Sequence, residues 1–170
     1  MPKPDRASWM WLPVPTDLGG FRASYSTTGL AELRFPSDNQ ASTVAPLVSA
    51  SSQVQQWHRV TIQAVNQILR GRNPRAFPPF DLSSGTEFQQ RVWRAMTKIS
   101  LGQTSSYGEL AAAIGKSKAV RAVGGACGAN PIPVLVPCHR VLAANNRIGG
   151  FSGGLDRKRE LLRREGVRLI

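Results

Sequence analysis

The sequence is poor in cysteine and contains no long hydrophobic run. Two cysteines in 170 residues are too few for a disulfide framework. No stretch approaches the roughly 20 apolar residues that a membrane-spanning helix needs. The first residues, Met1 to Arg6, lead into no apolar core of the kind that a signal peptide contains. We therefore expect a soluble, cytoplasmic protein without membrane contact, kept in a reducing compartment where free thiols persist.

Acidic side chains are also scarce. Asp and Glu number 10 against 22 Lys and Arg, which gives a net charge of +12. The imbalance lies mainly in the second half: residues 1–85 carry 8 basic and 5 acidic side chains, whereas residues 86–170 carry 14 and 5. A polyanionic partner for the C-terminal half is the natural inference. A basic surface that serves only solubility is the alternative.

The first half has the pattern of a small α/β unit. Residues 20–26 and 30–35 predict two short strands joined by a hairpin at Thr27–Gly29. A helix is predicted over 53–70, where apolar residues recur at helical spacing, and residues 36–52 predict a surface loop. The apolar stripe of the helix consists of Val54, Trp57, Val60, Ile62, Val65, Ile68 and Leu69.

The division into domains follows from composition. The stretch from Pro78 to Gly85 is rich in proline and serine, as linkers often are. We therefore predict an N-terminal domain over 1–77, a linker over 78–85 and a C-terminal domain over 86–170, with an α+β fold for the whole chain.

Helix signals punctuate the second half. Thr86 with Gln89 forms one capping-box pattern and Ser106 with Glu109 forms another. After the second, a short helix ends at Gly115 and a new helix begins beyond residue 118. A helix, a tight turn and a second helix make the arrangement that many DNA-binding proteins use.

The second helix of this pair carries glycine on one face. Val120, Val123 and Cys127 share the opposite face, which predicts a structural role for Cys127 in the core. Glycine weakens a helix by about 1 kcal/mol relative to alanine, so a run of exposed glycines favours a partner that approaches closely. DNA is the partner that the charge favours, and a tight helix–helix contact is the alternative. The glycine face comprises Arg121, Gly124, Gly125 and Gly128.

A cysteine and a histidine stand side by side in Pro137-Cys138-His139-Arg140, after an apolar run over 132–136. A cysteine reacts as its thiolate, and a neighbouring imidazole can remove the proton. The last helix, predicted over 156–165, turns Glu165 toward its buried side. A buried carboxylate needs a partner, and His139 or an arginine can provide it. The plain alternative is a buried cysteine that only packs.

These residues resemble the O6-alkylguanine-DNA alkyltransferases, a family of DNA repair proteins that accept an alkyl group once. The resemblance runs from about Thr86 to Leu169. It rests on an ordered set of motifs, namely Phe88-Gln89-Gln90-Arg91-Val92-Trp93, Ser106-Tyr107, Leu110-Ala111, Arg121-Ala122-Val123-Gly124, Asn130-Pro131, Pro137-Cys138-His139-Arg140, Ser152-Gly153-Gly154, Leu161-Leu162 and Glu165-Gly166.

The resemblance implies a role for each matching residue of the chemical site. Cys138 would accept the alkyl group, and His139 would take the thiol proton through a water, because neighbouring side chains on an extended chain point apart. Glu165 would orient His139. Asn130 would tie the second helix to the active-site strand, and Tyr107 would donate to the departing guanine.

The resemblance also implies the partner and the fold. The substrate would be double-stranded DNA with O6-alkylguanine, and by extension O4-alkylthymine, whose damaged base is flipped out from the minor groove while Arg121 fills the gap. The N-terminal domain would be ribonuclease-H-like and the C-terminal domain would hold a winged-helix-like helix-turn-helix. No cofactor or metal is implied, and the protein would be a monomer, with cooperative binding to DNA left open.

The resemblance implies two further sets of residues. DNA contacts would come from Ala119, Gly124, Gly125 and Ala126. The alkyl-base pocket would be formed by Tyr107, Val141, Phe151 and Ser152, within and around the loop 145–154.

Two departures from the family stand out. Phe151 occupies a position where many members have tyrosine, and residues 1–85 contain no cysteine and one histidine, so the zinc site of some relatives has no ligands here. No role follows from the sequence for Trp9 or Trp11. A cysteine hydrolase, a repair-inactive damage sensor and a sequence-specific regulator remain as alternatives, although glycine offers few groups for reading base edges.

Overall fold

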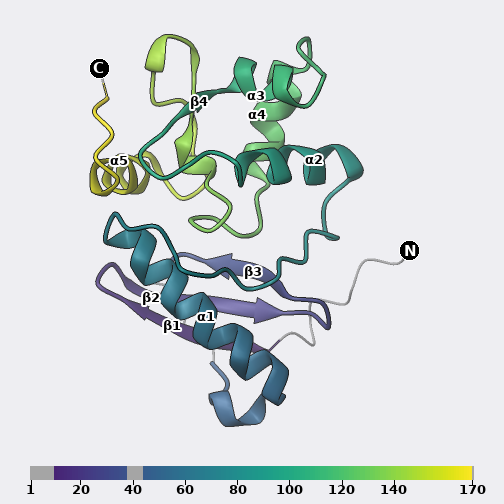
Figure 1. Ribbon diagram of the computed structural model, residues 1–170, viewed down its shortest axis with the longest axis vertical. Coiled ribbons are helices and arrows are strands. Elements are labelled where there is room, and N and C mark those ends of the chain that lie inside the picture. The colour runs from purple at the N-terminus through teal and green to yellow at the C-terminus, as the bar shows by residue number, and fades with distance from the viewer. Residues whose placement is uncertain (1–9, 38–43, 170) are drawn as a thin grey trace.

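The computed structural model describes residues 10–37 and 44–169, and its fold is α+β as expected. Figure 1 shows two layers: a sheet with one helix, and above it a group of helices. The sheet holds β1 (Trp11–Thr16), β2 (Gly19–Tyr25) and β3 (Leu30–Arg34), and α1 (Ser52–Leu69) packs against it. The helical part holds α2 (Glu87–Met96), α3 (Tyr107–Ala113), α4 (Val120–Gly128) and α5 (Leu155–Arg164).

The three strands form an antiparallel meander in the order β1-β2-β3. The predicted hairpin of β2 and β3 is confirmed. Strand β1 was not predicted, because Pro13 and Pro15 alternate with its two buried residues, Leu12 and Val14. Proline is tolerated there because β1 is an edge strand, where no partner on the outer side needs its N–H.

The two N-terminal tryptophans had no predicted role. Trp9 lies outside the described residues, as does the part of the predicted 36–52 loop that spans 38–43. The ring of Trp11 lies beneath two guanidinium groups, those of Arg34 at 4.4 Å and Arg22 at 5.3 Å from its centroid. Such contacts contribute about 0.5–1 kcal/mol at exposed sites, so Trp11 joins β1 to β2 and β3 on the sheet surface.

Helix α1 confirms the predicted helix to within one residue, with Ser51 as its cap. Its inward face is more polar than the sequence suggested, because His58 and Thr61 are buried as well as Val65 and Ile68. The His58 ring joins α1 to the sheet: Nδ1 lies 2.9 Å from the hydroxyl of Tyr25 on β2, and Nε2 lies 3.0 Å from the carbonyl oxygen of Pro13 on β1.

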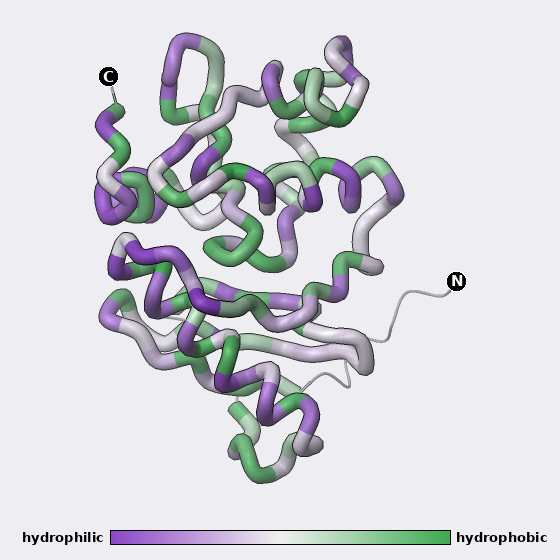
Figure 2. Tube along the Cα trace, viewed as in Figure 1, coloured by the Kyte–Doolittle hydropathy of each residue, from purple (hydrophilic) through white to green (hydrophobic). Residues whose placement is uncertain are grey.

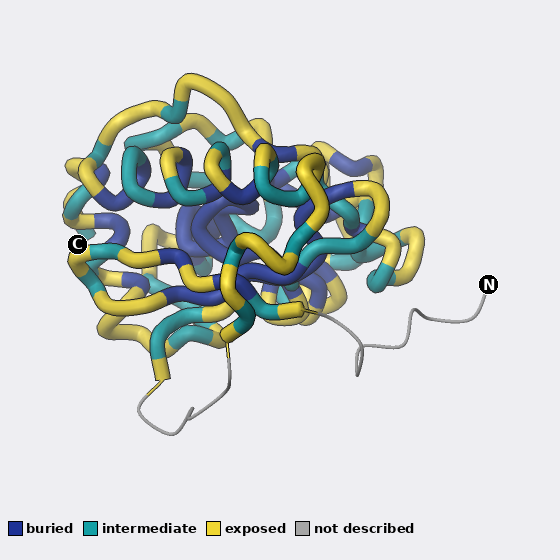
Figure 3. The backbone as a smooth tube through the Cα atoms, turned by 90° about the horizontal axis from the view of Figure 1, so that it is seen from below, coloured by how far each residue is buried: buried dark blue, intermediate teal, exposed yellow. Residues whose placement is uncertain are grey.

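Both halves of the chain meet at β3. Leu30 N donates a hydrogen bond to the Pro79 carbonyl, and Asp81 N donates one to the Leu30 carbonyl, each at 2.8 Å. The predicted linker therefore pairs with β3. Leu33 N donates to the carbonyl of Pro131 at 2.9 Å, which brings a C-terminal loop to the same strand. Figure 2 shows apolar segments in both layers, and Figure 3 shows buried segments at the centre of the molecule. The domain boundaries at 78 and 85 stay a prediction.

The C-terminal half begins as expected. Both predicted capping boxes are present, at Thr86 on α2 and at Ser106 on α3. Leu110 and Ile114 are buried, and the turn after α3 leads directly into α4, so the helix-turn-helix is present. The short strands β4 (Ser105–Ser106) and β5 (Val141–Leu142) pair in parallel beside it.

Two expectations for this half were wrong. The run over 132–136 is not an extended strand: it is a series of turns in which Val134 has a φ of 73°, followed by a 3-10 turn at Cys138–Arg140. A run of apolar residues predicts burial, which is observed, but does not by itself separate a strand from a buried turn. Val120, expected in the core, is 40% exposed because it is the first residue of α4, whereas Val123 and Cys127 one and two turns further on are buried.

Within the described part of the chain, no helix is both long and apolar enough to cross a membrane.

Burial of the histidines gives the fold a predictable response to acid. Burial lowers the pKa of His58 below its ordinary 6.5, against an opposing hydrogen bond to Pro13, and burial lowers that of His139 as well. The unfolded chain therefore binds protons below pH 6.5 that the folded chain does not, so stability present above that pH is lost as the pH falls. We expect the free energy of unfolding to drop by up to about 1.4 kcal/mol per pH unit for each histidine. Urea unfolding at pH 7.5, 6.5 and 5.5 measures this, and His58→Gln should show a smaller slope than the wild type. Equal slopes for the two proteins would contradict the role given to His58.

Candidate active site

The Cys138 thiol lies at the wall of a small cavity of about 120 Å³. The cysteine begins the 3-10 turn and is 4% exposed. Burial raises its pKa, while hydrogen bonding to the Asn130 side chain and the positive charge of Lys158 act against this. The resting group is therefore a protonated thiol, and a base is required before it can act as a nucleophile. The lining comprises Tyr107, Gly124, Cys127, Gly128, Cys138, Gly150, Phe151 and Ser152.

Asn130 fixes the turns that lead to Cys138. Its amide Nδ2 donates to the Val136 carbonyl at 2.7 Å, and its Oδ1 accepts from Ile132 N at 3.0 Å. Both bonds are buried, and together they satisfy backbone groups that no strand or helix serves. The predicted tie between the end of α4 and the segment before Cys138 is therefore present, although that segment is a turn rather than a strand.

Glu165 is the centre of a buried cluster behind the cysteine. Its Oε1 lies 2.8 Å from His139 Nε2 and accepts from Arg140 Nη2 at 2.9 Å. Its Oε2 accepts from Arg140 Nε at 2.8 Å and from Gly102 N at 3.2 Å. Burial alone would raise the pKa of Glu165, but the bonds from His139 and Arg140 outweigh it and hold the pKa at about 2. The carboxylate is therefore ionised and fully satisfied.

The ionised carboxylate determines the tautomer of His139. Glu165 can only accept, so Nε2 of the imidazole must carry a hydrogen and donate it. Burial lowers the pKa of His139, although the bond to Glu165 opposes this, so the ring is neutral at pH 7. Its other nitrogen, Nδ1, is then an acceptor, and it is buried with no hydrogen-bond partner among residues 10–37 and 44–169. A neutral imidazole with a free, buried Nδ1 is the form that can take a proton from a neighbouring thiol.

The sequence left open whether His139 or an arginine would pair with Glu165, and the structure shows both. Arg140 had no predicted role, but it donates two hydrogen bonds to the carboxylate and a third, from Nη1, to the Ile99 carbonyl at 2.6 Å. A carboxylate with four acceptor positions can serve two side chains at once. Arg140 therefore neutralises Glu165 without displacing His139.

Lys158 is a part of the site that sequence reasoning missed. It is fully buried, and its ammonium donates to the carbonyls of Val141 at 2.7 Å and Gly150 at 3.1 Å. Burial lowers its pKa to about 8, against the opposing influence of Cys138 and Cys127. A signal was available: Lys158 stands three and seven residues before Leu161 and Glu165, and that spacing places it on the buried stripe of α5.

The cavity walls agree with most of the predicted pocket. Tyr107, Phe151 and Ser152 line it, and Tyr107 Oη donates to the Gly150 carbonyl at 3.5 Å. Val141 does not line it and is fully buried in β5. Cys127, expected to be only structural, does line the cavity. Burial, together with proximity to Cys138, raises the pKa of Cys127 to about 12, so it remains a thiol.

The outer face of α4 carries the small residues that the sequence placed there. Arg121, Gly125 and Gly128 are exposed, and Gly124 and Ala119 are partly exposed. Ala126 is the exception, because it is 3% exposed and lies in the core, where its carbonyl accepts a hydrogen bond from Trp93 Nε1 at 2.7 Å. The expected placement of Ala126 on the partner-facing side was therefore wrong: it stands three residues after Val123, on the same side of the helix.

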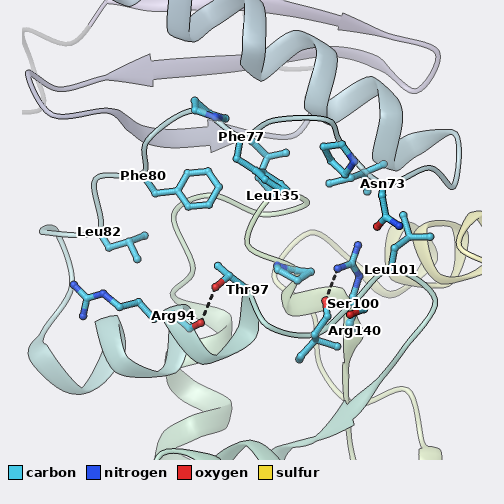
Figure 4. A pocket seen from close by; sticks show the side chains of 15 residues that line it. Asn73, Phe77, Phe80, Leu82, Arg94, Thr97, Ser100, Leu101, Leu135 and Arg140 are labelled. Atoms are coloured by element: carbon cyan, nitrogen blue, oxygen red, sulfur yellow. Dashed lines mark hydrogen bonds between the residues drawn. The ribbon is translucent and has the colours of Figure 1, made fainter.

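A larger cavity, of about 720 Å³, lies on the other side of the Cys138 turn, which contributes Pro137 and Arg140 to it (Figure 4). Phe77, Phe80 and Leu135 are among its apolar walls. Neither cysteine lines this cavity, and Arg140 turns its guanidinium toward Glu165 and Ile99. The nucleophile therefore faces the small cavity next to α4 rather than this one.

Comparison with known proteins supplies independent findings. Residues 87–167 match the family described as 6-O-methylguanine DNA methyltransferase, DNA binding domain. A methylated-DNA–protein-cysteine methyltransferase of Haemophilus influenzae is 52% identical over 86 residues, which cover 51% of this chain and 48% of the relative. One of Mycobacterium tuberculosis is 55% identical over 84 residues, covering 49% of this chain and 51% of the relative.

A solved structure extends the similarity to the N-terminal half. The crystal structure of Mycobacterium tuberculosis OGT in complex with DNA matches with a TM-score of 0.72 and 36% identity, and the match covers 92% of each chain. The chain spans about half the length of the curated relatives in the sequence matches. Sequence similarity is thus concentrated in the half that holds the cysteine, whereas the fold is shared throughout.

Proposed function

Because this chain belongs to the methylated-DNA–protein-cysteine methyltransferase family, we propose that it repairs DNA by moving the alkyl group of O6-alkylguanine to Cys138. The observation that carries the proposal is the arrangement around the cysteine: a buried thiol at a small cavity, beside a neutral His139 whose unpartnered Nδ1 can accept a proton. The same chemistry extends to O4-alkylthymine, which presents an alkyl carbon on an equivalent oxygen.

The first step is removal of the thiol proton. Cys138 and His139 are consecutive in a 3-10 turn, where neighbouring side chains point about 120° apart. No hydrogen bond joins the two side chains among the described residues, so a bridging water carries the proton from Sγ to Nδ1. The imidazolium that forms is stabilised by Glu165, 2.8 Å from Nε2. The developing thiolate is stabilised by the positive charge of Lys158 and by the Asn130 amide.

The second step is displacement at the alkyl carbon. The thiolate forms a bond to that carbon while the bond from carbon to O6 breaks, and the electron pair leaves with the guanine. Tyr107 lines the same cavity, so its hydroxyl can donate to the departing ring. The product is a thioether on Cys138. Water and an imidazole have no easy route to cleave a thioether, so each molecule acts once.

Access to the cavity requires the base to leave the helix. A stacked guanine cannot bring its alkyl carbon to a thiol that is 4% exposed, and enzymes that act on bases solve this by extruding the nucleotide. The exposed glycines of α4 let the minor groove approach, and Arg121, exposed on the same face, fills the space that the base leaves. The charge of +12 supports attraction to the phosphates.

The compartment follows from the same chemistry. Both cysteines are free in the structure, and a thiol nucleophile persists where the medium is reducing. We place the protein in the cytoplasm, as a monomer acting on double-stranded DNA.

The alkyl transfer is tested by mass. After mixing with duplex DNA that contains one O6-methylguanine, the intact mass should rise once by about 14 Da, because a methyl group replaces the thiol hydrogen. Peptide mapping should place the group on Cys138 and not on Cys127, because His139, the proposed base, directly follows Cys138. Cys138→Ser should take up no methyl group. Continued turnover, as a cysteine hydrolase would give, or a mass increase in Cys138→Ser would overturn the proposal.

Base extrusion is tested on Arg121. Arg121→Ala should slow repair of a duplex substrate by roughly tenfold or more. Without the Arg121 side chain, the free energy needed to unstack the base is no longer offset, and a loss of about 1.4 kcal/mol corresponds to a factor of ten in rate. The free base O6-benzylguanine needs no extrusion, so its reaction should change by less than about threefold on the same scale. Arg159→Ala removes an equal charge from the exposed side of α5 and is the control. Equal losses on both substrates would show that Arg121 supports the fold or the pocket instead.

A further inference from the structure

Phe151, which walls the small cavity, is held from the outside by the N-terminal half. Its ring meets the ring of Phe35 edge-on, with centroids 5.8 Å apart and planes at 73°. Phe35 follows β3 directly and in turn packs against Phe21 of β2, at 5.2 Å. Phe21 is 1% exposed, so the row of three rings runs from the core of the sheet to the wall of the cavity.

Arg157 on α5 fastens the same contact. Its guanidinium lies over the Phe35 ring, 5.1 Å from the centroid. From there Nη2 donates to the Pro36 carbonyl at 2.6 Å, and Nη1 donates to the Gly153 carbonyl at 3.4 Å. One side chain thus binds the end of β3 and the loop that carries Phe151.

Gly153 shows how close this approach is. A Cβ atom at that position would lie 2.7 Å from Cε1 of Phe151 and 2.8 Å from Cε2 of Phe35. Real Cβ contacts are essentially never that short, so the backbone of the loop fills the angle between the two rings. The ring of Phe151 is therefore confined by Phe35 and by its own loop.

We propose that Phe35, although it belongs to the N-terminal half and does not line the cavity, is a positioning residue for substrate binding. It sets the place of the Phe151 ring, and through that ring the width of the cavity that receives the alkylated base. The proposal rests on the proposed function. Phe151 has no hydroxyl through which a hydrogen bond could orient its ring. The ring is oriented by packing against Phe35 instead. Removing Phe35 should let the Phe151 ring turn outward and weaken binding of the base without altering the thiol chemistry.

A double-mutant cycle tests this inference. The single-turnover rate of reaction with O6-benzylguanine, measured against its concentration, gives a half-saturation concentration and a limiting rate. Phe35→Leu should raise the half-saturation concentration roughly three- to tenfold, the range that an aromatic pair of this kind is worth. The limiting rate and its pH profile should stay near the wild-type values, because Cys138, His139 and Glu165 are untouched. In a Phe151→Leu background the Phe35→Leu effect should disappear.

The controls separate positioning from stability. Val65→Ala, in the core of α1, destabilises the same half of the protein and should leave the half-saturation concentration unchanged. Phe35→Tyr keeps the ring and should behave as the wild type. If the effects of Phe35→Leu and Phe151→Leu simply add, or if Val65→Ala reproduces the first, Phe35 only supports the fold and the inference is wrong. If the wild type takes up no benzyl group at all, it is the proposed function that has failed, and this inference fails with it.

Discussion

The interaction on which the rest of the site depends is the buried carboxylate of Glu165. Four donors converge on it, from His139, Arg140 and the backbone of Gly102. An isolated carboxylate would be costly to bury, and losing one partner of a buried pair typically costs about 3–5 kcal/mol. Because each of its oxygens accepts two hydrogen bonds, the group stays ionised and fixes His139 as the Nε2–H tautomer, while burial of the ring keeps it neutral and leaves Nδ1 able to accept a proton.

The helix that ends at Glu165 also links the two halves of the chain. Glu165 is the C-cap of α5. The last residue of the helix, Arg164, donates hydrogen bonds to Asp17 in the β1–β2 turn and to the carbonyl of Leu69 at the end of α1. Near the start of the same helix, Lys158 and Arg157 hold the loop that walls the cavity. Helix α5 therefore connects the sheet to His139 and to the cavity loop. Through this helix the N-terminal half can influence substrate binding in a cavity that it does not line.

Much of this could be predicted from the sequence, where local patterns decide the outcome. The capping boxes at Thr86 and Ser106, the glycine face of α4 and the inward turn of Glu165 follow from spacing alone. Strand β1 was missed because prolines interrupt its apolar alternation, and the turn before Cys138 was taken for a strand because apolar runs do not distinguish the two. Arg140, Lys158 and Phe35 act through partners 25, 8 and 116 residues away. Helical spacing could have placed Lys158 on the buried side of α5, but no local pattern encodes which partners the three side chains contact.

The protonation state of His139 is the most direct test of this arrangement. Nitrogen chemical shifts of the two imidazole rings at pH 7, assigned with the His58→Gln variant, report whether each nitrogen carries a hydrogen. The ionised Glu165 predicts a hydrogen on Nε2 of His139 and a bare Nδ1, and burial, which lowers the pKa of the ring, predicts that it is neutral at pH 7 and takes up a proton only below pH 6.5. A charged imidazolium at pH 7, or a hydrogen on Nδ1, would contradict it, since neither form could take the proton from Cys138.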